Sequence, residues 1–130
     1  MSNIINRLKA HSEDLFVGKG ATPAQIAEAE TALGVRFADD YRSCLLEFGV
    51  VAFDGHELTG ITAAPRINVV EVTKKQRGLN SDIPPEMYVI EEANVDDIVI
   101  WQDCSCVVFG NVAGSEPIKL ANNLSEFLNA

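Results

Sequence analysis

The sequence holds 130 residues, 47% of them hydrophobic and 22% charged, and its ten basic and nineteen acidic side chains give a formal net charge of −9. This length suits one domain with its own hydrophobic core, which we expect to span residues 1–130. The acidic excess argues against nucleic acid as a direct partner, and the lack of a long apolar stretch or a signal-peptide layout predicts a cytoplasmic protein that does not contact a membrane.

The first part of the chain predicts three helices. Apolar residues at mostly helical spacing indicate an amphipathic helix over residues 3–16. A capping box at residues 22–25 begins a second helix, for which Gly34 is a natural end. Acidic residues from Asp39 onward begin a third helix that ends at Gly49. The second and third helices therefore form a helical hairpin.

The rest of the chain predicts mainly strands. Residues 50–61 indicate a β-hairpin around an Asp-Gly turn, and Asn68 is placed to cap a middle helix over 69–77. Asn122 or Asn123 opens a C-terminal helix. Further strands are predicted at 88–91, 98–102, 107–110 and 118–120. Short links between neighbouring strands favour an α+β fold: a mainly antiparallel sheet of about four to six strands, with the helical hairpin, the middle helix and the C-terminal helix packed against it.

No motif in the sequence indicates catalysis. The two histidines, His11 and His56, stand in neither a metal-binding nor a catalytic arrangement. Cys104 and Cys106 supply at most half of a zinc site, and we interpret both as reduced, small apolar side chains. We therefore expect no enzyme activity, no cofactor and no metal.

Carboxylates are the most informative polar residues. Those around the predicted strands fit three interpretations: solvated turns, an acidic surface that binds a partner, or a general acid/base pair. Glu30 is different, because it lies on the apolar stripe of the second helix. A buried carboxylate needs a partner, and Arg36 or Arg42 is close enough in sequence to provide one.

Residues 21–42, which read ATPAQIAEAETALGVRFADDYR, resemble the signature of the SUKH superfamily. This family comprises bacterial immunity proteins and yeast regulators of cell-wall glucan synthesis. Phe37-Ala38 departs from the Leu-Pro that is usual in the family signature. Residues 57–61 are similar to the Ile-x-Gly-Leu-like step that ends the family's Gly-rich hairpin. The matching positions in the signature are Glu30, Leu33, Gly34, Asp40 and Tyr41.

The resemblance implies an α+β fold and, for stand-alone bacterial members, neutralisation of a toxin by direct binding. It implies no catalytic residue, because the family has no shared catalytic site. The yeast relatives suggest an alternative role as an intracellular scaffold or regulator, and an enzyme that uses the acidic cluster is a third hypothesis.

A basic toxin, such as a nuclease, would meet an acidic surface where its substrate phosphates sit. We therefore expect the partner to be a protein toxin and the contact surface to be acidic. Two aromatic residues are added as possible anchors, although core packing is the alternative role for Trp101. The candidate partner-binding residues are Asp54, Glu57, Tyr88, Glu91, Glu92, Asp96, Asp97, Trp101 and Asp103.

Overall fold

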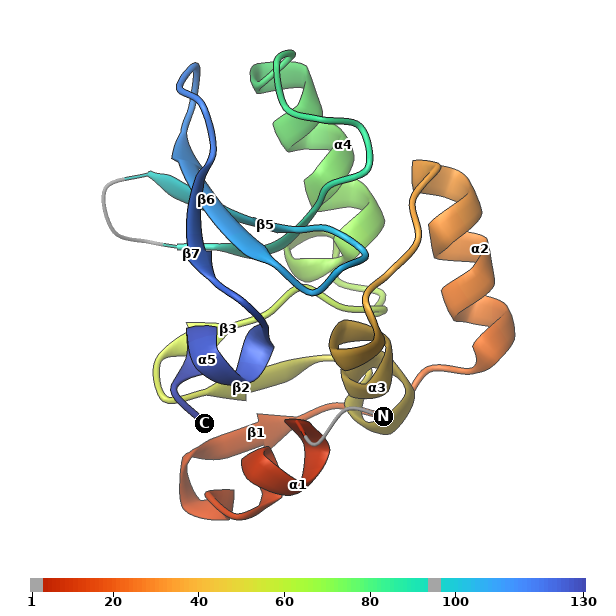
Figure 1. The fold of residues 1–130 in the computed structure, drawn as a ribbon. Coiled ribbons are helices and arrows are strands. Elements are labelled where there is room, and N and C mark those ends of the chain that lie inside the picture. Colours follow the sequence, from red (N-terminus) through yellow and green to blue (C-terminus); the bar gives the residue numbers. More distant parts are fainter. Residues whose placement is uncertain (1–3, 94–96) are drawn as a thin grey trace.

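The computed structural model describes residues 4–93 and 97–130, which form α-helices, short 3-10 turns and two antiparallel sheets (Figure 1). The α+β class is confirmed, with the strands divided between a sheet β1-β2-β3 and a sheet β4-β5-β6-β7. None of the helices in the described residues is long and apolar enough to cross a membrane. The elements are α1 (Ile4–Lys9), η1 (Ser12–Asp14), β1 (Leu15–Val17), α2 (Pro23–Leu33), α3 (Asp39–Phe48), β2 (Val51–Phe53), β3 (His56–Glu57), η2 (Pro65–Ile67), α4 (Val69–Leu79), β4 (Tyr88–Glu92), β5 (Ile98–Gln102), β6 (Val108–Val112), β7 (Ile118–Ala121) and α5 (Leu124–Leu128).

The N-terminal segment differs from the expected single helix over residues 3–16. Helix α1 ends at Lys9, and Leu15–Val17 pairs as strand β1 with Val51–Phe53. The free edge of β2 offers backbone partners that a longer helix would leave unused. In the strand, Phe16 points away from the core and is 73% exposed. The apolar residues at the end of the segment therefore do not belong to a helical stripe.

The helical hairpin forms as the sequence predicts. Thr22 and Gln25 exchange the two hydrogen bonds of a capping box, and Gly34 ends α2 in the left-handed conformation. Glu30 finds its partner in Arg42, whose guanidinium lies 2.6 Å from a carboxylate oxygen that also accepts from the Phe37 N–H at 2.8 Å. One carboxylate thus fixes the connector between α2 and α3.

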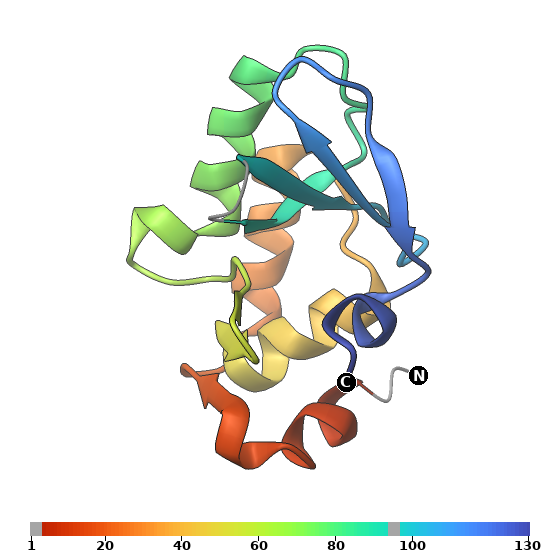
Figure 2. The same ribbon diagram turned by 90° about the vertical axis from the view of Figure 1, so that its left-hand side faces the viewer.

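The four-stranded sheet has two faces with different cover (Figure 2). Helix α4, capped by Asn68, contacts β4 and covers one face. There Val72 packs with Val89, Val99 and the fully buried Trp101. The opposite face meets α3 and α5 over only part of its width. The part of this sheet face that neither α3 nor α5 covers is therefore open to solvent.

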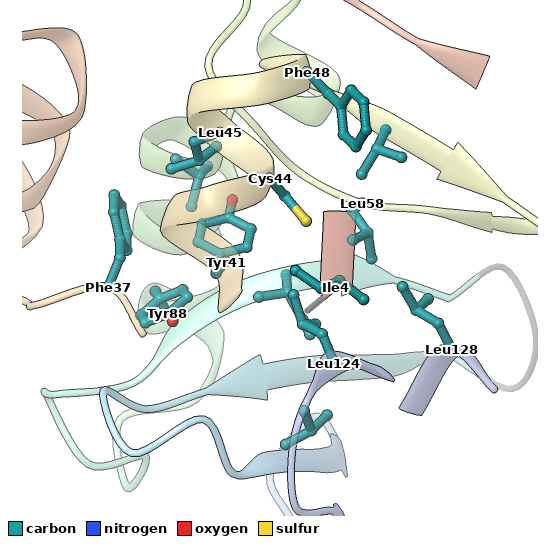
Figure 3. Close-up of a cluster of buried hydrophobic side chains, with 14 of the residues drawn as sticks. Ile4, Phe37, Tyr41, Cys44, Leu45, Phe48, Leu58, Tyr88, Leu124 and Leu128 are labelled. Carbon is teal, nitrogen blue, oxygen red and sulfur yellow. The ribbon is translucent and has the colours of Figure 1, made fainter. Parts of the chain in front are cut away.

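An aromatic cluster fills the centre of the covered part (Figure 3). The rings of Phe37, Tyr41 and Tyr88 lie with their centroids 4.8 to 5.2 Å apart. The Tyr88 hydroxyl donates to Gln102 and accepts from the Ala38 N–H. Burial raises the pKa of Tyr88 well above 10, so the hydroxyl stays neutral and serves as a hydrogen-bonding group.

Asp40 joins three elements from inside the core. Its carboxylate is buried, with 5% of the residue exposed, and accepts from the Tyr41 N–H in α3. It also accepts from the Gln102 side chain in β5 and from the Leu124 N–H at the start of α5, each at 2.9 Å. Charge-assisted hydrogen bonds of this kind are about twice as strong as neutral ones.

Loop glycines bring backbones into direct contact beside this core. A Cβ added at Gly20 would lie 2.2 Å from the Leu46 carbonyl oxygen, and one at Gly49 would lie 2.1 Å from that of Lys19. At Gly60 the added atom would lie 1.9 Å from the Gly49 carbonyl oxygen. No side chain fits at these distances.

Replacing Gly60 with Ala therefore tests the packing of these loops. Because the neighbouring atom is a backbone carbonyl that cannot rotate away, Gly60→Ala should lower the free energy of unfolding by about 3 kcal/mol. Gly78→Ala is the matched control, since nothing lies within 4 Å of its added Cβ on α4. That helix should gain about 1 kcal/mol, measured by urea denaturation. Equal stabilities of the two variants would contradict the packing described here.

Candidate functional site

A cleft of about 630 Å³ opens where the cover of the four-stranded sheet ends. Its floor is the uncovered end of the sheet face that elsewhere packs on α3 and α5. Hairpin β2–β3, η2 and α5 form the opposing wall. The volume lies in the range typical of binding sites in proteins. Its apolar lining consists mainly of Ile98, Ile100, Val112, Ile118, Leu120 and Phe127.

Strand register explains why these apolar side chains share one face. Ile100 pairs with Gly110, and Gly110 pairs with Ile118, so the three positions lie side by side across β5, β6 and β7. Gly110 has no side chain, and a Cβ there would lie 2.8 Å from the Leu120 side chain. The missing side chain therefore deepens the floor.

Glu91 connects the wall of the cleft to the sheet. This buried carboxylate, in β4, lies 2.9 Å from His56 Nδ1 and accepts from the Glu57 N–H at 2.9 Å. The His56 ring also packs against Phe127 of α5, with centroids 5.0 Å apart. Strand β3 has only two residues, so these side-chain contacts hold it in place.

The outer rim carries charge of both signs. Glu57 and Arg66 form a paired contact, with their atoms 2.6 and 3.1 Å apart. The hydrogen bonds from Arg66 lower the pKa of Glu57 below its usual 4.5. Glu92 is bound by Lys75 at 2.7 Å, whereas the exposed Glu116 has no ion pair within the described residues. The lining residues thus include four carboxylates and one guanidinium, that of Arg66, which in the described part of the chain pairs with Glu57 alone.

The structure brings together only some of the candidate residues. Glu57, Glu91 and Glu92 line the cleft, and Asp54 and Asp97 are exposed on turns directly beside lining residues. The remaining candidates do not gather there.

Tyr88 and Trp101 are fully buried and hydrogen-bonded within the core, so neither presents a surface to a partner here. Tyr88 packs in the aromatic cluster on one face of the sheet, and Trp101 packs with Val72 of α4 on the other face. Asp103 lies at the opposite end of β5 and binds the Ser105 N–H and hydroxyl. Asp96 lies outside the described residues.

Sequence reasoning missed the apolar floor, along with Arg66, His56 and Glu116. A signal for the floor was present in β7, where two aliphatic residues flank Lys119 with the period of two of a strand. This alternating pattern is too short to show whether the apolar face of the strand is buried in the core or open to solvent. His56 stands in no catalytic or metal-binding pattern in the sequence, yet its side chain is only 31% exposed and contacts Glu91 of β4 and Phe127 of α5.

The groups in the cleft favour recognition of a positive charge next to an apolar surface.

Within residues 4–93 and 97–130, no cluster of His, Cys, Asp and Glu has the arrangement of a metal site. The three cysteines are free. Burial raises the pKa of the Cys44 thiol to about 12, which keeps it protonated and unreactive at neutral pH.

Comparison with models of protein families shows the family to which the chain belongs. The model of SUKH_5, described as SMI1-KNR4 cell-wall, matches residues 1–130, the whole chain. The chain therefore belongs to this family, as its resemblance to the SUKH superfamily indicated. No curated protein matches it.

Replacing Glu91 tests the connection between β3 and β4. Glu91→Ala leaves the Glu57 N–H and His56 without an acceptor and should lower the free energy of unfolding by about 2 kcal/mol. Glu91→Gln keeps one acceptor and should cost less. Glu116→Ala, at an exposed rim position, should change stability by about 0.5 kcal/mol or less, measured by urea denaturation. A Glu91→Ala value as small as that of Glu116→Ala would mean that the connection is absent.

The pair of Glu57 and Arg66 predicts a pH effect. The Glu57 carboxyl, followed by NMR, should titrate below 4.5 and should return toward 4.5 in Arg66→Gln. Because the folded-state pKa is below the unfolded one, the pair stabilises the fold above the unfolded value and loses that effect as pH falls through the folded value. The wild type should therefore lose more stability on acidification than Arg66→Gln. Identical titration midpoints would exclude the pair in solution.

Proposed function

We propose that this SUKH-family chain is a non-catalytic immunity protein, which neutralises a basic protein toxin by binding it at the cleft. The observation that supports the proposal is the combination of an apolar floor with a rim of excess carboxylate. Protein interfaces use this combination: the apolar centre supplies affinity, and the charged rim selects the partner and speeds association.

The charge of the whole molecule favours the same partner. At −9, the chain repels acidic proteins and nucleic acid and attracts a basic surface over about one Debye length. A toxin that acts on nucleic acid has a basic groove for phosphates. Carboxylates such as Glu92 and Glu116 would occupy the positions of those phosphates and exclude the substrate. This mechanism requires binding and no reaction.

The test pairs this chain with the protein encoded by the gene next to its own, taken as the candidate toxin. Co-expression should protect cells, and the purified proteins should form a complex whose association rate falls steeply with salt. Glu92→Gln combined with Glu116→Gln should slow association by about tenfold at low salt and flatten the salt dependence.

Glu28→Gln combined with Glu71→Gln is the matched control, since it removes the same charge from α2 and α4, outside the cleft. This control should associate nearly as fast as the wild type. Equal rates for the two double variants would remove the cleft from the interface. A toxin that neither binds the chain nor is neutralised by it would overturn the proposed function.

A role in regulating cell-wall synthesis is the second candidate, because the matching family is described as SMI1-KNR4 cell-wall. That role predicts stable complexes with endogenous proteins in unstressed cells. Capture of the chain's partners from such cells, with and without the adjacent toxin gene, separates the two candidates.

A further inference from the structure

The two outer strands of the four-stranded sheet differ in how their edges are used. On β4, Thr59 N–H donates to the Ile90 carbonyl at 2.8 Å, and the Thr59 hydroxyl donates to that of Val89. The Val89 N–H donates to the Thr73 hydroxyl at 3.0 Å. The edge of β4 is thus closed by neighbouring segments.

Strand β7 ends the sheet on the other side, and no strand in the described part of the chain pairs with its outer edge. An unpaired edge presents a row of N–H and C=O groups that another chain can bind. Natural edge strands are usually protected by charges or by covering segments. On β7 the exposed Lys119 is the one such charge, whereas Ile118 is 69% exposed and Leu120 is 48% exposed, and both line the cleft.

We propose that the basic partner inserts an extended segment, which pairs with β7 and extends the sheet by one strand. Alternate side chains of that segment would lie on the apolar floor beside Ile118 and Leu120. A lysine or arginine of that segment beyond the start of β7 would reach Glu116 at the rim. This inference rests on the proposed function, in that it takes the partner to be a basic protein.

Charge decides between this occupant and a second copy of the chain. Pairing β7 with β7 of another copy would bring two molecules of charge −9 together with their acidic rims adjacent. Like charges close together at an interface cost several kcal/mol. A basic segment is instead attracted by the net negative charge of the chain. The strand edge therefore suits a basic chain better than a copy of itself.

The experiment uses the full chain and a capped eight-residue peptide of alternating lysine and valine. We expect the peptide to bind and to slow hydrogen exchange in residues 118–121, while exchange in β1, an outer strand of the other sheet, stays unchanged. A peptide with the same side chains but N-methylated on alternate residues should bind about tenfold or more weakly, because it loses the backbone hydrogen bonds on one side. A lysine-alanine peptide of equal charge should also bind more weakly.

Two variants of the chain locate the site. Ile118→Lys should lose most of the binding, since it places a positive charge on the floor. Leu79→Lys is the matched control: Leu79 is 62% exposed on α4 and lies outside the cleft, so this variant should bind like the wild type. Both positions are exposed, so both variants should fold.

Equal affinity of the N-methylated peptide, or binding without protection of β7, would overturn strand addition. A dimer of the chain alone that protects β7 would overturn it in favour of a second copy. The toxin separates this inference from the proposed function. Toxin binding without β7 protection contradicts strand addition alone, whereas peptide addition to β7 without toxin binding contradicts the toxin role alone.

Discussion

The buried carboxylate of Asp40 is the constraint on which the arrangement of the elements depends. It accepts hydrogen bonds from the first turn of α3, from a side chain of β5 and from the first turn of α5. A carboxylate in the core is costly unless every lone pair is used, and these donors supply that compensation. Because the donors come from the three regions of the chain that enclose the core, α5 cannot leave the sheet without exposing an unsatisfied charge. The wall of the cleft, which includes Phe127 of α5, is fixed by this contact.

The residues that carry the family resemblance have structural roles. Glu30 binds Arg42 and the Phe37 N–H, Gly34 ends α2, and Tyr41 fills the aromatic cluster while its hydroxyl contacts Thr59. These contacts explain how the signature specifies the fold, and they leave the choice of partner unspecified. The residues that line the cleft all come from the part of the chain between 55 and 127, which lies outside the signature. Under the proposed function, the second part of the chain would therefore select the partner, while the signature maintains the scaffold.

Local signals predicted most of the elements, and long-range contacts account for what was missed. The capping box at Thr22, the cap at Asn68 and the strand over 98–102 all follow from neighbouring residues, and the structure confirms them. Strand β1 was missed because its partner lies some 36 residues away and no local pattern distinguishes a short strand from the end of a helix. For the site, the sequence indicated carboxylates but not their grouping. Whether Glu91 lies beside His56 depends on how β3 folds onto β4, which no spacing along the chain reveals.

The open end of the sheet is the part of the structure that stability alone does not explain. Val112, Ile118 and Leu120 are 47%, 69% and 48% exposed, although burying each aliphatic side chain would contribute about 1.5 kcal/mol or more. Gly110 adds to this cost, since glycine weakens a strand and a larger residue would fill the hollow. The same chain closes the β4 edge with Thr59 and Thr73, so it has the means to protect a strand. The open edge, the apolar floor and the acidic residues lie together at the place where the proposed partner would bind, and departures from the rules of stable packing concentrate at functional sites.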